Sequence, residues 1–266
     1  MSWNDLSKNH IKLSDTHANE YDDNYGSPIT KSYMDYEEKR IITAINKLGP
    51  KDRHTAIDVG SGTGRCSFLL SSFFHNVIGY DFSHMMIEKA KGNALGKDIK
   101  NVNFEIRDIN LEGLGLHKNN ISFLNLAFGM GSFWESLDYL IDECSRVLSH
   151  SGILYVTFYN SASFVCQYAD SINLGLSALP KVNSNQLVVD GIPIPCKYYT
   201  INFIEEAFQS KGYEIISITS YPSLLPIVYG GVLKDKNTFD FCVSADKKVE
   251  QMKKGYYISA ILRKQL

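Results

Sequence analysis

Acidic residues and glycines stand together where apolar runs of the chain end. Asp58 lies within the run at residues 55–59, and glycines follow it at positions 60, 62 and 64. Glycines after a strand allow a tight turn and a close approach of the backbone to a ligand. A helix beginning near Gly64 would present free N–H groups and the positive end of its dipole, which stabilise an anionic group such as a carboxylate. The pattern predicts a ligand site at the end of this strand.

Two further acidic residues restrict the choice of ligand. Asp81 ends the next apolar run, about 20 positions beyond the glycines, and an acid there can accept hydrogen bonds from both ribose hydroxyls. Asp108 follows the third run, where a carboxylate could accept from the exocyclic amine of an adenine. Asp58 would repel a pyrophosphate and attract an amino group, so it favours S-adenosylmethionine over NAD. The glycine turn alone leaves open a nicotinamide dehydrogenase or a simple strand-to-helix connection.

Strands and helices alternate around these residues. We expect strands at 55–59, 76–80, 102–106, 121–126, 152–159, 213–219 and 255–263, and helices at 29–48, 64–74, 83–91, 134–148 and 201–211. This alternation is typical of a parallel sheet with helices on both faces and right-handed crossovers. Ligands of such sheets bind beyond the carboxyl ends of the strands.

Three segments interrupt the alternation. Residues 1–28 are polar, and we expect them to be mobile. Residues 161–200 hold a short helical segment and then Asp190-Gly191 between apolar runs, which is a hairpin signal. We expect this insert to lie over one end of the sheet, within a single domain at 29–266. Residues 221–233 contain prolines and are expected to form a loop.

Several motifs follow one another in a fixed order. DxGxGxG stands at 58–64, YDFS at 80–83, RDI at 107–109 and RVL at 146–148. This ordered set resembles the class I S-adenosylmethionine-dependent methyltransferase family, mainly over residues 21–159. The resemblance implies an α/β, Rossmann-like three-layer sandwich. Its sheet would be mostly parallel and seven-stranded, with an antiparallel C-terminal strand and the helix-hairpin insert as a cap. Two positions depart from the family pattern, namely Ser122 in place of an aspartate and Ser151 in place of a glycine.

The resemblance implies S-adenosylmethionine as the cofactor and S-adenosylhomocysteine as the product. The glycine turn would hold the methionine part, Asp81 the ribose hydroxyls, and residues 82, 86, 108 and 109 the adenine. A YDxxY-like stretch at 21–25 would cover the cofactor, which makes residues 1–28 a lid. The cofactor-binding residues expected are Tyr21, Tyr25, Asp58, Gly60, Ser61, Gly62, Asp81, Phe82, Met86, Asp108, Ile109 and Asn125.

Aromatic residues near the later strand ends are the candidates for substrate binding. Such a wall suits a small, partly apolar molecule or a cationic amine. The run FGMGSFW at 128–134 is similar to that of small-molecule enzymes of the family. The residues expected to face the substrate are Phe128, Trp134, Tyr159, Asn160, Tyr199 and Tyr229, with Tyr21 and Tyr199 as candidates for proton handling. We therefore expect methyl transfer to a nitrogen or oxygen nucleophile of a small molecule. The alternatives are peptide or protein methylation and a cofactor-binding scaffold without turnover.

The composition restricts the partners. The formal net charge is -2, from 27 basic and 29 acidic side chains, so nucleic acid is an unexpected partner. Five scattered cysteines contain no CxxC pair and predict no metal site. The polar N-terminus has no signal-like apolar region, and no apolar run reaches membrane-spanning length. We expect a cytoplasmic protein without membrane contact that is a monomer or a homodimer.

Overall fold

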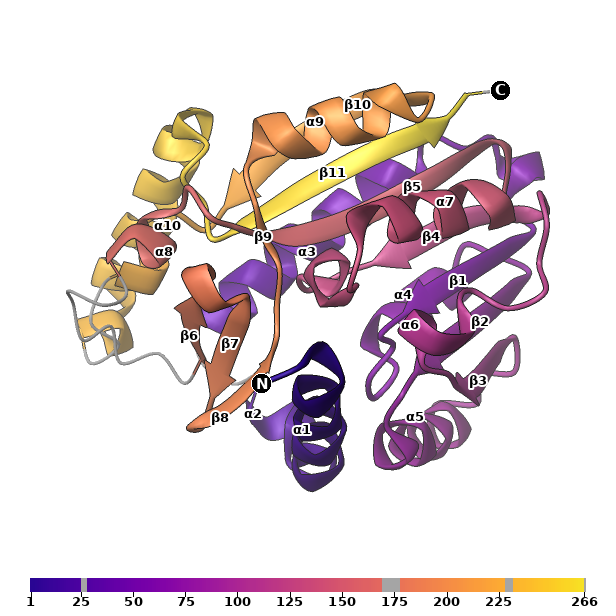
Figure 1. Ribbon diagram of the computed structural model, residues 1–266, viewed down its shortest axis with the longest axis horizontal. Helices are drawn as coiled ribbons and strands as arrows, with labels where there is room; N and C mark the ends of the chain where they lie inside the picture. The colour runs from indigo at the N-terminus through magenta and orange to yellow at the C-terminus, as the bar shows by residue number, and fades with distance from the viewer. Residues whose placement is uncertain (25–27, 169–177, 228–231, 266) are drawn as a thin grey trace.

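The computed structural model describes residues 1–24, 28–168, 178–227 and 232–265. A mostly parallel sheet with strand order β10-β11-β5-β4-β1-β2-β3 forms its centre (Figure 1). The strands are β1 (Thr55–Val59), β2 (Asn76–Asp81), β3 (Val102–Ile106), β4 (Ile121–Leu126), β5 (Leu148–Asn160), β10 (Tyr213–Tyr221) and β11 (Tyr257–Lys264). The short β9 (Tyr198–Tyr199) pairs with β5 beside this order. Strand β11 runs antiparallel to both of its neighbours, so the predicted sheet is confirmed.

Helices cover both faces of the sheet, which gives three layers. Alternate residues of β1 point to opposite faces, because the side-chain period of a strand is two. Ile57 packs with α7 (Leu137–Val147) and α9 (Ile201–Ser210), whereas Ala56 packs with α3 (Pro28–Ile45) and α4 (Arg65–Ser71). Two more helices lie near the β3 edge, namely α5 (His84–Gly96) and the short α6 (Ile109–Glu112). All the helices expected on either face are present, with ends shifted by a few residues.

The N-terminal segment, which we expect to be mobile, is largely helical. Helix α1 (Trp3–His17) begins with a capping box between Ser2 and Asp5, and α2 (Tyr21–Asn24) follows it. Leu6 and Leu13 of α1 are buried, and the helix packs against α5 and against the inserted sheet. The polar composition hid a narrow apolar stripe that suffices to dock the helix.

The insert at 161–200 contains more than the helix and hairpin that the sequence predicts. After α8 (Phe164–Tyr168), strands β6 (Ala178–Lys181), β7 (Gln186–Val189) and β8 (Ile192–Pro195) form a separate antiparallel sheet in the order β6-β7-β8. The hairpin is confirmed, since Asp190 and Gly191 both have positive φ, at 49° and 80°, as a type I′ turn requires. Figure 1 shows this sheet beside α1.

One long helix was missed entirely. Helix α10 (Lys236–Val249) is capped by Asp235 and follows the expected proline-containing loop. Its buried Asp246 accepts hydrogen bonds from the backbone N–H groups of Ser223, Leu224 and Leu225. The helix therefore fixes that loop through a carboxylate, and its Phe239, Cys242 and Val243 pack against the neighbouring apolar cluster. Short 3₁₀ helices lie at Pro50–Asp52, Met130–Phe133, Val182–Ser184, Leu225–Ile227, Val232–Lys234 and Glu250–Met252.

Among the described residues, no helix combines the length and the apolar character that crossing a membrane requires.

Two glycines should respond in opposite ways to replacement by alanine. A Cβ on Gly255, just before β11, would overlap the backbone of Ser220 and Tyr221, whereas a Cβ on Gly92 of α5 meets nothing. We expect Gly255→Ala to lower the free energy of unfolding by about 2 kcal/mol or more, since backbone must shift. Gly92→Ala should raise it by about 0.5–1 kcal/mol, because alanine favours the helix. Urea denaturation followed by circular dichroism measures both, and an equal effect of the two changes would contradict this packing.

Candidate functional site

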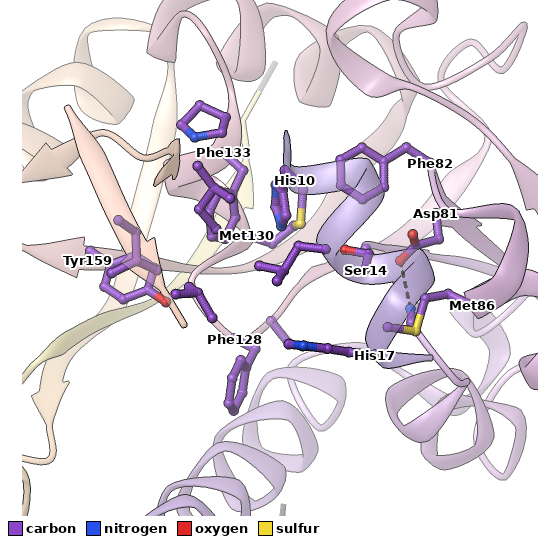
Figure 2. A pocket seen from close by; sticks show the side chains of 18 of the residues that line it. His10, Ser14, His17, Asp81, Phe82, Met86, Phe128, Met130, Phe133 and Tyr159 are labelled. Carbon is purple, nitrogen blue, oxygen red and sulfur yellow. Dashed lines mark hydrogen bonds between the residues drawn. The ribbon is translucent and has the colours of Figure 1, made fainter. Parts of the chain in front are cut away.

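A cavity of about 540 Å³ opens at the carboxyl ends of the parallel strands. Its floor consists of the glycine turn after β1, the end of β2 and the segments that follow β3 and β4. Helix α1 and the inserted β6-β7-β8 sheet supply the opposite walls. Eight residues expected to bind a cofactor line it together: Tyr21, Gly60, Gly62, Asp81, Phe82, Met86, Asp108 and Ile109. Figure 2 shows part of this lining, with Asp81 and Tyr159 near its two ends.

Asp81 joins the end of β2 to the glycine turn. Its carboxylate accepts one hydrogen bond from the N–H of Gly62 and one from the N–H of Ser83, each 2.9 Å long. Burial raises the pKa of Asp81 to about 6, although the two N–H groups oppose this shift. Gly60 and Gly62 have positive φ, and a Cβ on Gly60 would collide with the sulfur of Met130. The turn thus favours glycine for its conformation, and at Gly60 a side chain would also displace Met130.

Asp58 lies behind the cavity wall, although we expected it to contact the ligand. Asp58 lies on the same face of β1 as Ala56, so its side chain points toward α4 and away from the cavity at the end of the strand. Its carboxylate accepts hydrogen bonds from the hydroxyl of Ser67, at 2.6 Å, and from the amide of Asn125, at 2.7 Å. Burial raises the pKa of Asp58 to about 6. Asn125 and Ser61 are also absent from the lining, and the described residues offer no hydrogen-bond partner to Asn125 Oδ1 or Ser61 Oγ.

Glu37 of α3 is a buried carboxylate that the sequence reasoning missed. One of its oxygens accepts from the hydroxyl of Tyr33 and from the N–H of Phe128. The other accepts from the guanidinium of Arg65, at 2.6 Å. Phe128 lines the cavity with a positive φ of 55°, which is strained for a residue with a side chain. An acid at helical spacing between Tyr33 and Ile41 was the signal that could have revealed it.

Helix α1 lies in the segment predicted as a lid and contributes a wall of the cavity, with lining residues that the sequence analysis did not name. Its residues at 7, 10, 13, 14 and 17 line the cavity, and this spacing corresponds to one face of a helix. Asp15 secures the helix to α5 by accepting a hydrogen bond from Ser83 Oγ, and Asn9 donates one to the carbonyl of Pro193 in β8. Near the helix end, His17 lies 3.7 Å from Asp190. Helix α1 therefore connects the glycine-turn side of the cavity to the inserted sheet.

Packed aromatic rings form the end of the cavity farthest from Asp81. Tyr33 stacks on Tyr257 with centroids 4.2 Å apart, and Tyr159 lies 4.9 Å from the same ring. Burial raises the pKa of Tyr33, Tyr159, Tyr256 and Tyr257 above the ordinary value. These hydroxyls stay protonated at neutral pH, so they can donate hydrogen bonds but cannot serve as bases.

Three of the expected substrate residues do not line the cavity. Trp134 is fully buried in the core against Tyr139, because the 3₁₀ turn before it directs Phe133 into the cavity. Asn160 donates to the carbonyls of Lys253 and Gly255, which makes it a structural bridge. Tyr199 stacks on Phe203 away from the cavity, and burial raises its pKa. Phe128 and Tyr159 do line the cavity, whereas Tyr25 and Tyr229 lie outside the described residues.

Comparisons with known proteins agree with this geometry. A methyltransferase-domain family matches residues 50–173, which span β1 to β5 and the glycine turn. A Dictyostelium discoideum protein named as a methyltransferase is 28% identical over 142 residues, 52% of this chain and 50% of that protein. A Saccharomyces cerevisiae protein named as an S-adenosylmethionine-dependent methyltransferase is 25% identical over 135 residues, 50% of this chain and 45% of that protein.

Residues 50–173 of this chain thus match a methyltransferase domain, and the relatives that it matches over about half of its length are named as methyltransferases. The chain spans about half the length of the curated relatives that it matches. The geranyl diphosphate C-methyltransferase of Streptomyces coelicolor, solved with S-adenosylhomocysteine, is 14% identical and has a TM-score of 0.57. The alignment covers 87% of this chain and 80% of that one, and at this identity it supports the shared fold.

The cavity fits the cofactor of this methyltransferase family, S-adenosylmethionine. Above Gly62, a Cβ would meet only the Tyr21 ring at 3.6 Å, whereas the Met130 side chain covers Gly60. Asp81 presents a carboxylate to the cavity, and Phe82, Met86 and Ile109 add apolar surface beside it. A charged acceptor next to an apolar slot is the combination that a ribose and an adenine require.

Loss of the Glu37 carboxylate should destabilise this methyltransferase domain strongly. We expect Glu37→Ala to lower the free energy of unfolding by about 3 kcal/mol, because it removes a buried carboxylate that accepts hydrogen bonds from Arg65, the Tyr33 hydroxyl and the Phe128 N–H. Glu38→Ala, on the exposed side of the same helix, should change it by less than about 0.5 kcal/mol. Urea titrations of both variants provide the measurement, and equal midpoints would refute the role of Glu37.

Proposed function

We propose that this chain transfers the methyl group of S-adenosylmethionine to a nitrogen or oxygen atom of a small molecule. The observation that carries the proposal is one cavity with two unlike ends. The glycine turn and Asp81 form one end, and aromatic side chains form the other. Helix α1 and the inserted sheet line the space between them.

The proposed cofactor position follows the order of the strand ends. Gly60 and Gly62 would lie under the methionine part, and Tyr21 would cover it, since its ring lies 3.6 Å from the point where a Gly62 Cβ would stand. Asp81 would accept hydrogen bonds from the ribose hydroxyls. Phe82, Met86, Ile109 and Asp108 would enclose the adenine, as the sequence motifs predict. Asp58, Ser61 and Asn125 would support the turn from behind.

The charges around the glycine turn favour a cation. Glu37, Asp58 and Asp81 are buried carboxylates. The charge of Glu37 contributes to the raised pKa of Asp58 and the charge of Asp58 to that of Asp81, and Arg65 is the cation paired with Glu37. A pyrophosphate would be repelled there, whereas a sulfonium and an α-amino group would be attracted. This balance supports S-adenosylmethionine over the nicotinamide alternative.

The walls of the aromatic end favour a small acceptor. A peptide would have to pass beneath both α1 and the inserted sheet, because residues of each line the cavity. Among the described lining residues, Arg107 is the one lysine or arginine, and it lies at the β3 end near Glu105 and Glu112. An anionic acceptor would find no cation at the aromatic end. We therefore favour an uncharged or cationic small molecule over a peptide.

The work of the chain is largely positional. When bound, the cofactor supplies a methyl group on a positively charged sulfur, which is a good leaving group. Phe128, Phe133 and Tyr159 would hold the acceptor against it and exclude water, and fixing two reactants accounts for much of the rate enhancement of such reactions. The protonated tyrosines would orient the acceptor by donating hydrogen bonds.

Calorimetric binding of S-adenosylhomocysteine to the whole chain tests the cofactor site. We expect Asp81→Asn to weaken binding at least about tenfold, because hydrogen bonds to a charged acceptor contribute about 1.5–3 kcal/mol each. Asp98→Asn, an exposed change after α5, should leave the affinity unchanged. Absence of binding by the unaltered chain, or equal affinity of the two variants, would overturn the proposal.

Acid should weaken the same binding in a defined direction. Ribose hydroxyls donate to the ionised carboxylate, and the pKa of Asp81 is raised to about 6, so protonation removes the acceptor as the pH falls below that value. We expect the affinity for S-adenosylhomocysteine to be constant from pH 7 to 8 and to fall by up to about tenfold per pH unit below pH 6. In Asp81→Asn the affinity should depend less on pH, because only the contribution of Asp58 to this dependence remains. A wild-type affinity that rises toward pH 5 would contradict this assignment.

A further inference from the structure

His10 of α1 lies where the two ends of the cavity meet. Its ring centroid is 4.8 Å from that of Phe82, which adjoins Asp81, and 4.8 Å from that of Phe133. Phe133 in turn contacts Tyr159, with centroids 6.0 Å apart. Figure 2 shows His10 between Phe82 on one side and Met130 and Phe133 on the other. A methyl group that passes from the cofactor end to the aromatic end has to cross the space that His10 borders.

The ring nitrogens of His10 have no hydrogen-bond partner among the described residues, and the side chain lines the cavity. Burial lowers the pKa of His10 to about 4, so the ring is neutral at pH 7 and one nitrogen carries a free lone pair. The side chain is partly exposed, and its nitrogens are not among the buried atoms without a partner, so they are open to the cavity. The imidazole is therefore an acceptor whose partner a ligand in the cavity can supply.

Other groups that line the cavity are poorly suited to take a proton at this junction. The tyrosines of the aromatic end are held protonated by burial. Asp190 is paired with His17 on the turn of the inserted hairpin. Asp81 and Asp108 lie at the cofactor end, where each already accepts a backbone N–H. His10 is the neutral base that stands between the two ends.

On the basis of the proposed methyltransferase function, we propose that His10 accepts the proton of a hydroxyl group on an uncharged alcohol or phenol. The chain would then be an O-methyltransferase. A hydroxyl is a weak nucleophile that gains from a positioned base. An amine would be bound largely as an ammonium, which brings a second positive charge beside the sulfonium and must lose a proton before it can accept a methyl group. Of the described lining residues, Asp190 is the one carboxylate outside the cofactor end, and it already lies beside His17. The neutral imidazole thus fits a hydroxyl better than an amine.

The step balances in atoms and charge. The acceptor oxygen forms a bond to the methyl carbon while the carbon–sulfur bond breaks, and the electron pair of that bond stays on sulfur. His10 takes the hydroxyl proton through its free nitrogen. One positive charge passes from sulfur to the imidazole, so the net charge inside the cavity does not change. Because burial disfavours the imidazolium, His10 returns its proton to water when the product leaves.

The test uses the full chain, tritiated S-adenosylmethionine and two matched sets of probes. The hydroxyl probes are phenol, benzyl alcohol and cyclohexanol, and the amine probes are aniline, benzylamine and cyclohexylamine. We expect methylation of hydroxyl probes and a fall in kcat of about 10²–10⁴-fold in His10→Phe, with KM changed less than about threefold. Phenylalanine keeps the ring packing against Phe82 and Phe133 but removes the base. His150→Phe, at an exposed site at the start of β5, should leave the rates unchanged.

A second variant separates chemistry from folding. His10→Ala should lose hydroxyl methylation and regain part of it when imidazole is added, which a purely structural role would not produce. Methylation of amine probes alone, undiminished hydroxyl methylation in His10→Phe, or no methylation of any probe by a chain that binds S-adenosylhomocysteine would each overturn the role of His10. A chain that does not bind S-adenosylhomocysteine would fail at the earlier step, and the methyltransferase proposal would fall with it.

Discussion

The hydrogen bond from the Gly62 N–H to the Asp81 carboxylate is the contact on which the cavity depends. It fixes the glycine turn after β1 against the end of β2, two strands that pair in parallel. Gly62 carries no Cβ, and a Cβ there would meet only the Tyr21 ring, at 3.6 Å. The same carboxylate accepts the N–H of Ser83 at the start of α5, so one side chain sets the relation between turn, strand and helix. Burial of that carboxylate makes it a strong hydrogen-bond acceptor whenever it is ionised.

The buried carboxylates around the turn differ in the hydrogen-bond donors that they contact. Asp58 is held by neutral donors on α4 and β4, whereas Glu37 is paired with Arg65 and also holds the backbone of Phe128. Each buried acid has partners, as burial requires. When these carboxylates are ionised, their negative charges outnumber the one positive charge of Arg65, which leaves a net negative charge near the turn. A cationic ligand would relieve this excess, which connects the stability of the domain to the kind of molecule that it would bind.

The N-terminal helix links regions that are distant in the sequence. Asp15 contacts α5, Asn9 contacts β8, and the face between them lines the cavity. A ligand in the cavity would touch the sheet below it and α1 beside it. Docking of α1 and filling of the cavity should therefore support each other, because both bury surface at the same interface.

The sequence by itself determined the order of the seven main strands and of the five helices that flank them, the glycine turn and the positions of Asp81 and Asp108. These features depend on local patterns, namely the apolar periods of two and 3.6 residues and the turn preferences of glycine. Such patterns can be recognised in the sequence. The hairpin at Asp190-Gly191 was legible for the same reason. Only the tertiary structure decided which face Asp58 points to, that Phe133 and not Trp134 enters the cavity, and that Glu37 and His10 belong to the site. Those outcomes depend on packing between segments far apart in the chain, such as α1 against β8 and α3 against the β4 end, and such contacts leave no local pattern.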